Sequence, residues 1–328
     1  MTWRTAVSYL GAVAAAAGLL LTVAHGAAPA EAQDTAETVE ERVRKLLGEA
    51  SSYLEEDAAK REAAKNALVE IGAPAAPLLV ARLDTPDVME QLALADVLPR
   101  IGESAVDALH EAFLDPTSAR QHRRVIGLIG KIGSPRSTSI LVEAAGDSDW
   151  AIRASAAEGL GRIAAGDPAA RARLYELLHD EDWGVRLQAT WAIGDAGLAG
   201  DVDTLAALLD DRHFAVRLAA AELLAAQGQS AVGAIARRLE ARNLTPVGKL
   251  TCLDALGQTH HPAAAAHIEP FLIDPDPVVR VHAARAYGSA ALSTGAALCT
   301  ALLAEEPKPV VAAALRAAQA EIEARTAR

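Results

Sequence analysis

Residues 180–194 read DEDWGVRLQATWAIG, and this pattern recurs along the chain with small variations. Residues 147–161 read DSDWAIRASAAEGLG, in which Trp150 and Arg153 take the places of Trp183 and Arg186. The residues equivalent to Arg186 lie 30 to 33 positions apart. They are Arg61, Gln91, His122, Arg153, Arg186, Arg217, Lys249, Arg280 and Ala312. A period of this size indicates a repeat protein, in which each unit packs only on its neighbours.

Each repeat contains two helical patterns. The second begins near the arginine, because apolar residues then recur at helical spacing, as in Val185, Ala189 and Ile193. Aspartates stand where they would cap these helices, and prolines stand where the first turn tolerates them. The aspartates are Asp149, Asp182 and Asp276, and the prolines are Pro246, Pro277 and Pro309. An apolar first helix precedes each second helix, for example at 174–178. The sequence therefore predicts an all-α protein, an α-solenoid of about nine helix pairs over residues 38–328.

The composition agrees with a helical array and argues against a nucleic-acid partner. Hydrophobic residues make up 51% of the 328 residues and aromatic residues only 3%, so small aliphatic side chains must form the core. The net charge of −12 would repel phosphate backbones. Two cysteines are too few for a disulfide framework. Because Cys252 and Cys299 both fall at core positions of the helical pattern, we expect buried free thiols.

The first 32 residues are typical of an export signal. An uncharged stretch rich in Ala and Leu occupies residues 5–30, and residues 30–32 read AEA, which suits cleavage before Gln33. The competing interpretation is an uncleaved membrane anchor, since residues 5–30 are long enough to span a bilayer. Both interpretations predict an exported protein, periplasmic or extracellular, and the uncleaved anchor would hold it at the inner membrane. A short polar linker at 33–37 then leads to the repeats.

The repeats resemble the HEAT-repeat family, above all its short, Ala-rich bacterial branch, which includes the HEAT-like repeats of phycobilisome bilin lyases. The resemblance covers residues 38–328 and rests on a Pro-x-Leu-Leu-like first helix, an Asp-x-x-Trp/Phe/Pro-x-Val-Arg turn and an Ala-Ala-x-x-Leu-Gly second helix. It implies a right-handed superhelix whose second helices line a concave face used for protein binding. It also implies a ladder between turn aspartates and second-helix arginines of neighbouring repeats. The matching residues are Asp149, Arg153, Asp182, Arg186, Arg217, Asp276 and Arg280, while Gln91, His122 and Ala312 depart from the pattern.

No catalytic constellation stands out in the sequence. Deoxyhypusine hydroxylase, an enzyme of similar fold, needs several His-Glu pairs at equivalent repeat positions, whereas this chain has one, His110-Glu111. Bilin attachment in the lyase family is intracellular, which disagrees with an export signal. Four histidines lie close in sequence, but no acidic or cysteine residues complete a site at metal spacing. They are His260, His261, His267 and His282. We therefore predict no catalytic residue, no cofactor and no metal.

Two groups of side chains remain as candidates for binding a partner protein. The first lies five residues after the arginine, where the second helix should face the concave surface; it is a mainly acidic row with one tryptophan at its centre. It comprises Asn66, Asp96, Gly127, Glu158, Trp191, Glu222, Asp254 and Arg285. The second group contains the turn aromatics Trp150, Trp183 and Phe214, which would line up along one edge. Both could seat a basic or apolar segment of a partner. The alternatives are a solvated charged face and rings that pack between turns.

The leading hypothesis is an exported, non-catalytic scaffold that binds a partner protein through its concave face and its turns. A second hypothesis is a lyase-like enzyme or ligand carrier, which predicts a closed pocket near Trp191 or in the region from His260 to His282. A third is a self-associating assembly factor of the cell envelope. The sequence names no partner for any of them.

Overall fold

The computed structural model describes residues 37–326. The expected signal segment, its cleavage site and residues 33–36 of the linker lie outside the described residues. The described residues contain helices and turns but no β-strand. None of the described helices is both long and apolar enough to cross a membrane.

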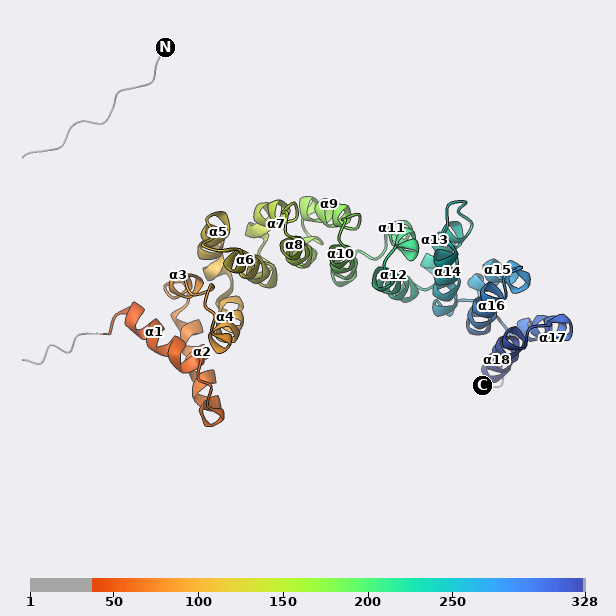
Figure 1. The fold of residues 1–328 in the computed structure, drawn as a ribbon, viewed down its shortest axis with the longest axis horizontal. Coiled ribbons are helices and arrows are strands. Elements are labelled where there is room, and N and C mark those ends of the chain that lie inside the picture. The colour runs from red at the N-terminus through yellow and green to blue at the C-terminus, as the bar shows by residue number, and fades with distance from the viewer. Residues whose placement is uncertain (1–36, 327–328) are drawn as a thin grey trace, which may run out of the picture. The chain divides into compact units, whose positions relative to one another are not determined.

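Each repeat contains a first and a second helix, which alternate along the chain (Figure 1). The first helices are α1 (Val39–Ala50), α3 (Ala76–Val80), α5 (Val106–Leu114), α7 (Thr138–Ala144), α9 (Pro168–Leu177), α11 (Val202–Ala207), α13 (Gln229–Leu239), α15 (Ala263–Ile268) and α17 (Gly295–Glu305). The second helices are α2 (Ala58–Ile71), α4 (Val88–Ile101), α6 (Ala119–Ile132), α8 (Trp150–Ile163), α10 (Trp183–Asp195), α12 (Phe214–Ala226), α14 (Pro246–Gln258), α16 (Pro277–Ala290) and α18 (Pro309–Thr326). The predicted all-α solenoid of helix pairs is confirmed.

The helices pack on near neighbours in the chain. Each second helix contacts the first helix of its own repeat and the second helices before and after it, as α8 contacts α7, α6 and α10. The core is therefore continuous along the array, but no pair depends directly on a distant one.

Side-chain caps begin most of the second helices. Asp182 accepts hydrogen bonds from the backbone N–H groups of Gly184 at 2.7 Å and Val185 at 3.3 Å. Asp149 and Asp276 cap α8 and α16 in the same way, as predicted. His213 replaces the aspartate at the start of α12, where its Nδ1 accepts from the N–H of Ala215. These caps satisfy backbone donors that the first helical turn leaves without a partner, and so fix where each second helix begins.

The core consists of aliphatic side chains, as the composition predicts. The stripe of Val185, Ala189 and Ile193 is fully buried. Cys252 and Cys299 are also fully buried and free, and burial raises the pKa of the Cys252 thiol to about 12. The expectation of buried free thiols at core positions is confirmed.

Glycines allow neighbouring second helices to approach closely. A β-carbon at Gly161 of α8 would lie 2.7 Å from the β-carbon of Ala192 in α10. Gly257 meets Ala286 and Gly288 meets Ala318 at the same position of later repeats. Contacts this short leave no room for a side chain, so a larger residue at Gly161 would force the two helices apart.

Candidate functional site

The turns before the second helices carry a regular set of buried ion pairs. Arg186, the fourth residue of α10, donates from Nε and Nη2 to the two carboxylate oxygens of Asp211 in the next repeat, at 2.7 and 2.8 Å. Its Nη1 donates to the carbonyls of Asp180 and Glu181 at 2.8 and 3.1 Å. Arg153 holds Asp180 in the same way, with distances of 2.7 and 2.8 Å. We call these interactions rungs, since each ties one repeat to the next.

The rung carboxylates are charged in spite of their burial. Burial would raise the pKa of Asp211, but the hydrogen bonds from Arg186 and from the His213 backbone N–H outweigh it and hold that pKa below its usual value. The pKa of Asp180 is lowered against its burial by Arg153 and the Asp182 N–H. Paired and hydrogen-bonded carboxylates of this kind hold the turn in one geometry.

The rungs use different acids from those expected from the resemblance. Arg153 and Arg186 pair with Asp180 and Asp211, while the predicted partners Asp149 and Asp182 serve as helix caps. The rung acid stands two residues before the cap of the next second helix, because there it reaches both the arginine and the cap's N–H. The sequence shows this spacing as an acid two residues before each of the predicted caps Asp149, Asp182 and Asp276, a signal that the prediction of the ladder missed. Asp149 also forms an ion pair with Arg123 of α6.

Further rungs follow the same geometry toward the C-terminus. Arg280 pairs with Glu306 at 2.9 Å through both oxygens, and Lys249 reaches Asp274 at 3.4 Å. Asp276 only caps α16. Arg217 is the exception, because its side chain makes one hydrogen bond, from Nη1 to the Asp211 carbonyl at 2.8 Å, and pairs with no carboxylate of residues 37–326. The ladder is thus interrupted at Arg217, in the middle of the array, in addition to the interruptions expected toward its ends at Gln91, His122 and Ala312.

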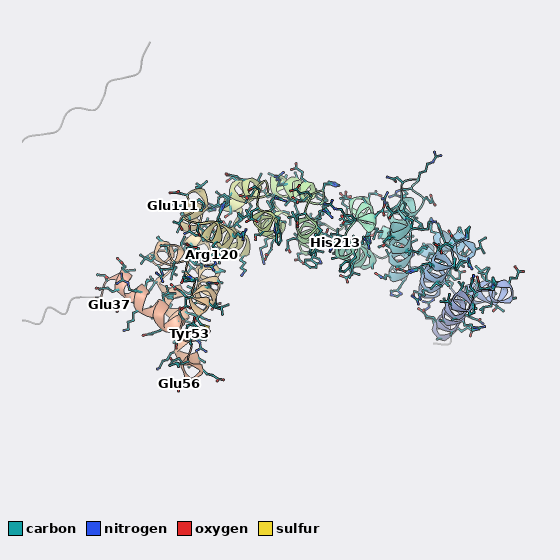
Figure 2. All side chains as sticks on the ribbon, viewed as in Figure 1. Glu37, Tyr53, Glu56, Glu111, Arg120 and His213 are labelled. Carbon is teal, nitrogen blue, oxygen red and sulfur yellow. The ribbon has the colours of Figure 1, made fainter. Side chains whose placement is uncertain are left out.

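The turn aromatics form a row of exposed but supported rings. Trp150, Trp183 and Phe214 are the first residues of α8, α10 and α12, and each exposes between 46% and 66% of its surface. Trp183 stacks on His213 of the next turn, with ring centroids 3.9 Å apart and planes 15° apart. Figure 2 labels His213 between α10 and α12. We call Trp150, Trp183, His213 and Phe214 the aromatic edge.

The same edge continues on both sides of Trp183. Atoms of the Trp150 ring lie 3.5 Å from the place of a β-carbon on Gly184, so this indole rests against the following turn. His213 in turn lies 5.0 Å from the Phe214 ring. Trp150 and Trp183 therefore pack against neighbouring turns, and together with Phe214 they still expose between 46% and 66% of their surface, which combines the two arrangements weighed for them.

Several acidic side chains of the row on the second helices already have a basic partner within the protein. Asp96 pairs with Lys65 at 3.2 Å, Glu158 with Arg162 at 3.1 Å, and Asp254 with His282 at 2.7 Å. Trp191 is 47% exposed, and Glu222 and Arg285 are exposed as well. Because several charges already have partners, Trp191, Glu222 and Arg285 are the members most available to another molecule. The other two positions are Asn66, which is exposed, and Gly127, which is half-buried.

Three hollows on the described residues were compared with the predicted pocket, and neither Trp191 nor His282 lines any of the three. One, of about 530 Å³, is lined by His260, Pro262 and residues near the end of α16. Arg325 lines it too, but donates to the carbonyls of Ser289 at 2.6 Å and Ala291 at 2.9 Å. A smaller hollow of about 320 Å³ lies between α4 and α6 and is lined by Leu92, Gly127 and Lys131 among others. The largest, about 660 Å³, lies between α1 and Arg82.

The described residues hold no cluster of three or more His, Cys, Asp or Glu side chains able to bind a metal. His282 is bonded to Asp254, and His260 lies in a turn with a positive φ of 50°. His110, of the one His-Glu pair, bonds Ser137 at 2.9 Å, and burial lowers its pKa. His282 and His110 thus make contacts between neighbouring repeats.

Comparison with solved structures shows which known folds these repeats resemble. Solved structures that resemble the chain include importin beta, at 16% identity and a TM-score of 0.59, covering 88% of this chain and 46% of that one. Human deoxyhypusine hydroxylase is 22% identical, with a TM-score of 0.35 and coverages of 79% and 98%. The CpcE–CpcF complex of a phycocyanin lyase from Nostoc is 19% identical, with a TM-score of 0.38 and coverages of 75% and 94%. At these identities the likeness concerns the fold alone.

No curated protein sequence matches the chain. The sequence model of the family described as HEAT repeats matches four overlapping segments, at residues 78–161, 106–194, 141–225 and 172–246. Together they span more than half of the chain, and they contain the rungs of Arg153 and Arg186 and the aromatic edge. The chain belongs to the HEAT-repeat family.

Proposed function

We propose that this protein is an exported, non-catalytic scaffold that binds a partner protein through the aromatic edge and the adjoining face of the second helices. The observation that carries the proposal is that three large aromatic residues on successive turns are held in fixed positions with about half of their surface uncovered. Aromatic side chains are the commonest anchors of protein interfaces. A HEAT-repeat solenoid supplies the extended surface that such binding uses.

The rungs support the proposal because they hold the turns that carry the aromatic edge in one geometry before a partner binds. Trp183 sits one residue after the cap Asp182, and His213 sits two residues after the rung acid Asp211. Arg186 joins these two turns through its contacts with Asp211 and with the carbonyls beside Asp182. Anchors that are already ordered lose less conformational entropy when a partner binds.

The second helices that follow the aromatic edge carry two further exposed side chains that a partner could contact, Trp191 and Glu222. Trp191 lies on α10, the helix that Trp183 begins, and Glu222 lies on the next second helix. Glu222 is exposed and has no ion pair among the residues that the structure describes. An exposed indole and an unpaired acid on successive second helices suit a basic or apolar segment of a partner.

Affinity capture from the envelope fraction of the source cells tests the proposal. The variant with Trp150→Ala, Trp183→Ala and Phe214→Ala should lose partners that the unaltered chain retains, while circular dichroism shows the same helix content. Tyr53→Ala is a matched control, because Tyr53 is a 68% exposed aromatic in the first repeat (Figure 2). A triple variant that keeps every partner would show that the aromatic edge does not bind them.

The export part of the proposal rests on the sequence at 5–32. Fusion of residues 1–37 to a phosphatase that is active only outside the cytoplasm should give an active reporter. N-terminal sequencing of the mature protein distinguishes cleavage before Gln33 from an uncleaved anchor. An inactive fusion that is nevertheless produced would contradict export.

The small-molecule carrier is a second candidate, and the hollow beside His260 and Arg325 is the observation that favours it. The hollow has room for a ligand, although Arg325 already donates to backbone carbonyls. Thermal shift assays with metabolite and metal panels test it, since a ligand that binds the folded state raises Tm. Sedimentation velocity of the same protein tests the self-assembly alternative.

A further inference from the structure

Arg217 lies in the rung position of α12, but the acid that should face it is missing. The rung arginines Arg153 and Arg186 are the fourth residues of their helices, as Arg217 is, and each holds an acid two residues before the next cap. The next cap after Arg217 is Thr245, so this place belongs to Asn243. A neutral, exposed Asn243 therefore stands where Asp180 and Asp211 stand in the preceding repeats.

The guanidinium of Arg217 is nevertheless held in the rung pose. Its Nη1 donates to the Asp211 carbonyl at 2.8 Å, just as Nη1 of Arg186 donates to the Asp180 carbonyl at 2.8 Å. In Arg186 the opposite edge of the guanidinium, Nε and Nη2, donates hydrogen bonds to the carboxylate of Asp211. In Arg217 this edge has no acceptor among the described residues, and the side chain is only half-buried. Nε and Nη2 of Arg217 are thus oriented to bind a carboxylate, but no carboxylate of the described residues binds them.

The two acids in the turn before α12, Asp210 and Asp211, already have partners. Asp211 is gripped by Arg186 through both oxygens. Asp210, at the end of the preceding first-helix segment, accepts from Arg238 at 2.7 Å and from Thr245. Neither is therefore free to pair with Arg217. Arg212 and Arg242 are exposed and add positive charge to the same two turns, in a protein whose net charge is −12.

The surroundings of Arg217 on α12 and α14 are apolar. Phe214 is three residues before it and belongs to the aromatic edge. Leu218 beside it and Val247 at the start of α14 are about half exposed. An acidic side chain flanked by apolar ones would match this combination, whereas a nucleic-acid backbone would meet a strongly acidic protein and few aromatic platforms.

We propose that Arg217 is the acceptor site for an aspartate or glutamate side chain of the partner protein, which completes the missing rung between α12 and α14 from outside the chain. The inference deepens the proposed protein-binding function and rests on it. The part of the partner that meets Arg217, distinct from the part that meets Trp191 and Glu222, is acidic and apolar. Its carboxylate binds Nε and Nη2 of Arg217, and its apolar residues lie against Phe214, Leu218 and Val247.

The test uses a capped hexapeptide of alternating glutamate and leucine as the probe, and its glutamine–leucine counterpart as the neutral control. Arginine Nε–Hε signals of the labelled full chain are followed by NMR at constant ionic strength, with Arg217 assigned from Arg217→Lys. The acidic peptide should shift the Arg217 signal and the neutral peptide should not. Acetate shows whether a free carboxylate suffices without apolar flanks. Failure of the acidic peptide to move the Arg217 signal overturns the inference.

Two substitutions sharpen the result. Arg217→Gln should weaken binding of the acidic peptide about tenfold or more, since a hydrogen-bonded charge pair is lost. Arg242→Gln removes the same charge from a neighbouring exposed position and should leave the affinity within about twofold. Asn243→Asp supplies the missing acid within the chain, so it should raise Tm and weaken peptide binding. Equal losses in Arg217→Gln and Arg242→Gln would mean diffuse attraction and would refute a specific site.

The same variants separate this inference from the proposed function. If Trp183→Ala loses the captured partner while Arg217→Gln and Asn243→Asp retain it, the aromatic edge binds the partner and the carboxylate site is refuted. If all these variants retain it, the proposed function fails as well.

Discussion

Replacing Arg186 by methionine should destabilise the junction between α10 and α12. Methionine keeps most of the aliphatic bulk but removes all four hydrogen bonds that Arg186 donates. The side chains of Arg186 and Asp211 are only 5% and 8% exposed, so the carboxylate left behind has little water to replace its partner. Breaking a buried pair by removing one member costs about 3 to 5 kcal/mol. We expect a loss near the lower end, since the His213 N–H still donates to Asp211.

Urea unfolding followed by circular dichroism measures this loss of unfolding free energy. Arg237→Met is the matched control, because Arg237 and Asp203 form an ion pair whose side chains are 64% and 68% exposed. Exposed pairs contribute about 0 to 1 kcal/mol. Hydrogen exchange should also accelerate in α10 and α12 more than in α2, because each pair packs only on its neighbours. A loss for Arg186→Met no larger than that of the control would refute the structural importance assigned to the rungs.

Other expected outcomes follow from the same contacts. Because the pKa values of Asp180 and Asp211 are lowered in the folded protein, their stabilisation is present above the unfolded value of about 3.9 and is lost as pH falls through the folded values. Calorimetry should thus show Tm falling below about pH 4, less steeply in Asp211→Asn. Gly161→Val should cost about 1 to 3 kcal/mol by overpacking against Ala192, whereas Gly48→Ala, with open space around it, should gain up to about 1 kcal/mol in urea titrations. Cys252 should resist a thiol reagent at pH 8 until urea unfolds the chain, and rapid labelling of the native protein would contradict its burial.

The sequence was sufficient to predict the helix pairs and the core. Caps such as Asp182, apolar stripes such as Val185 to Ile193, and the core position of Cys252 are local signals that repeat at a fixed period. Each repeat therefore confirms the interpretation of the others. The family resemblance, which rests on the same motifs, predicted the same fold, and the match to the HEAT-repeat family model agrees with it.

The candidate site was less predictable because it depends on the register between repeats. The stacking of Trp183 on His213 needs the position of one turn relative to the next, which no single repeat encodes. The choice of Asp211 over Asp182 as the partner of Arg186 depends on which acid lies within reach across the junction. The missing acid opposite Arg217 becomes visible only when that register is known.

Packing between neighbouring pairs alone has a mechanical consequence. In the described part of the chain the helices pack within a repeat and on adjacent repeats, so pairs pulled from the two ends can unravel one after another at low force. Each released pair of about 31 residues would lengthen the chain by roughly 100 Å of contour, at about 3.3 to 3.6 Å per residue. The array can thus act as an extensible spring whose steps are set by the repeat length.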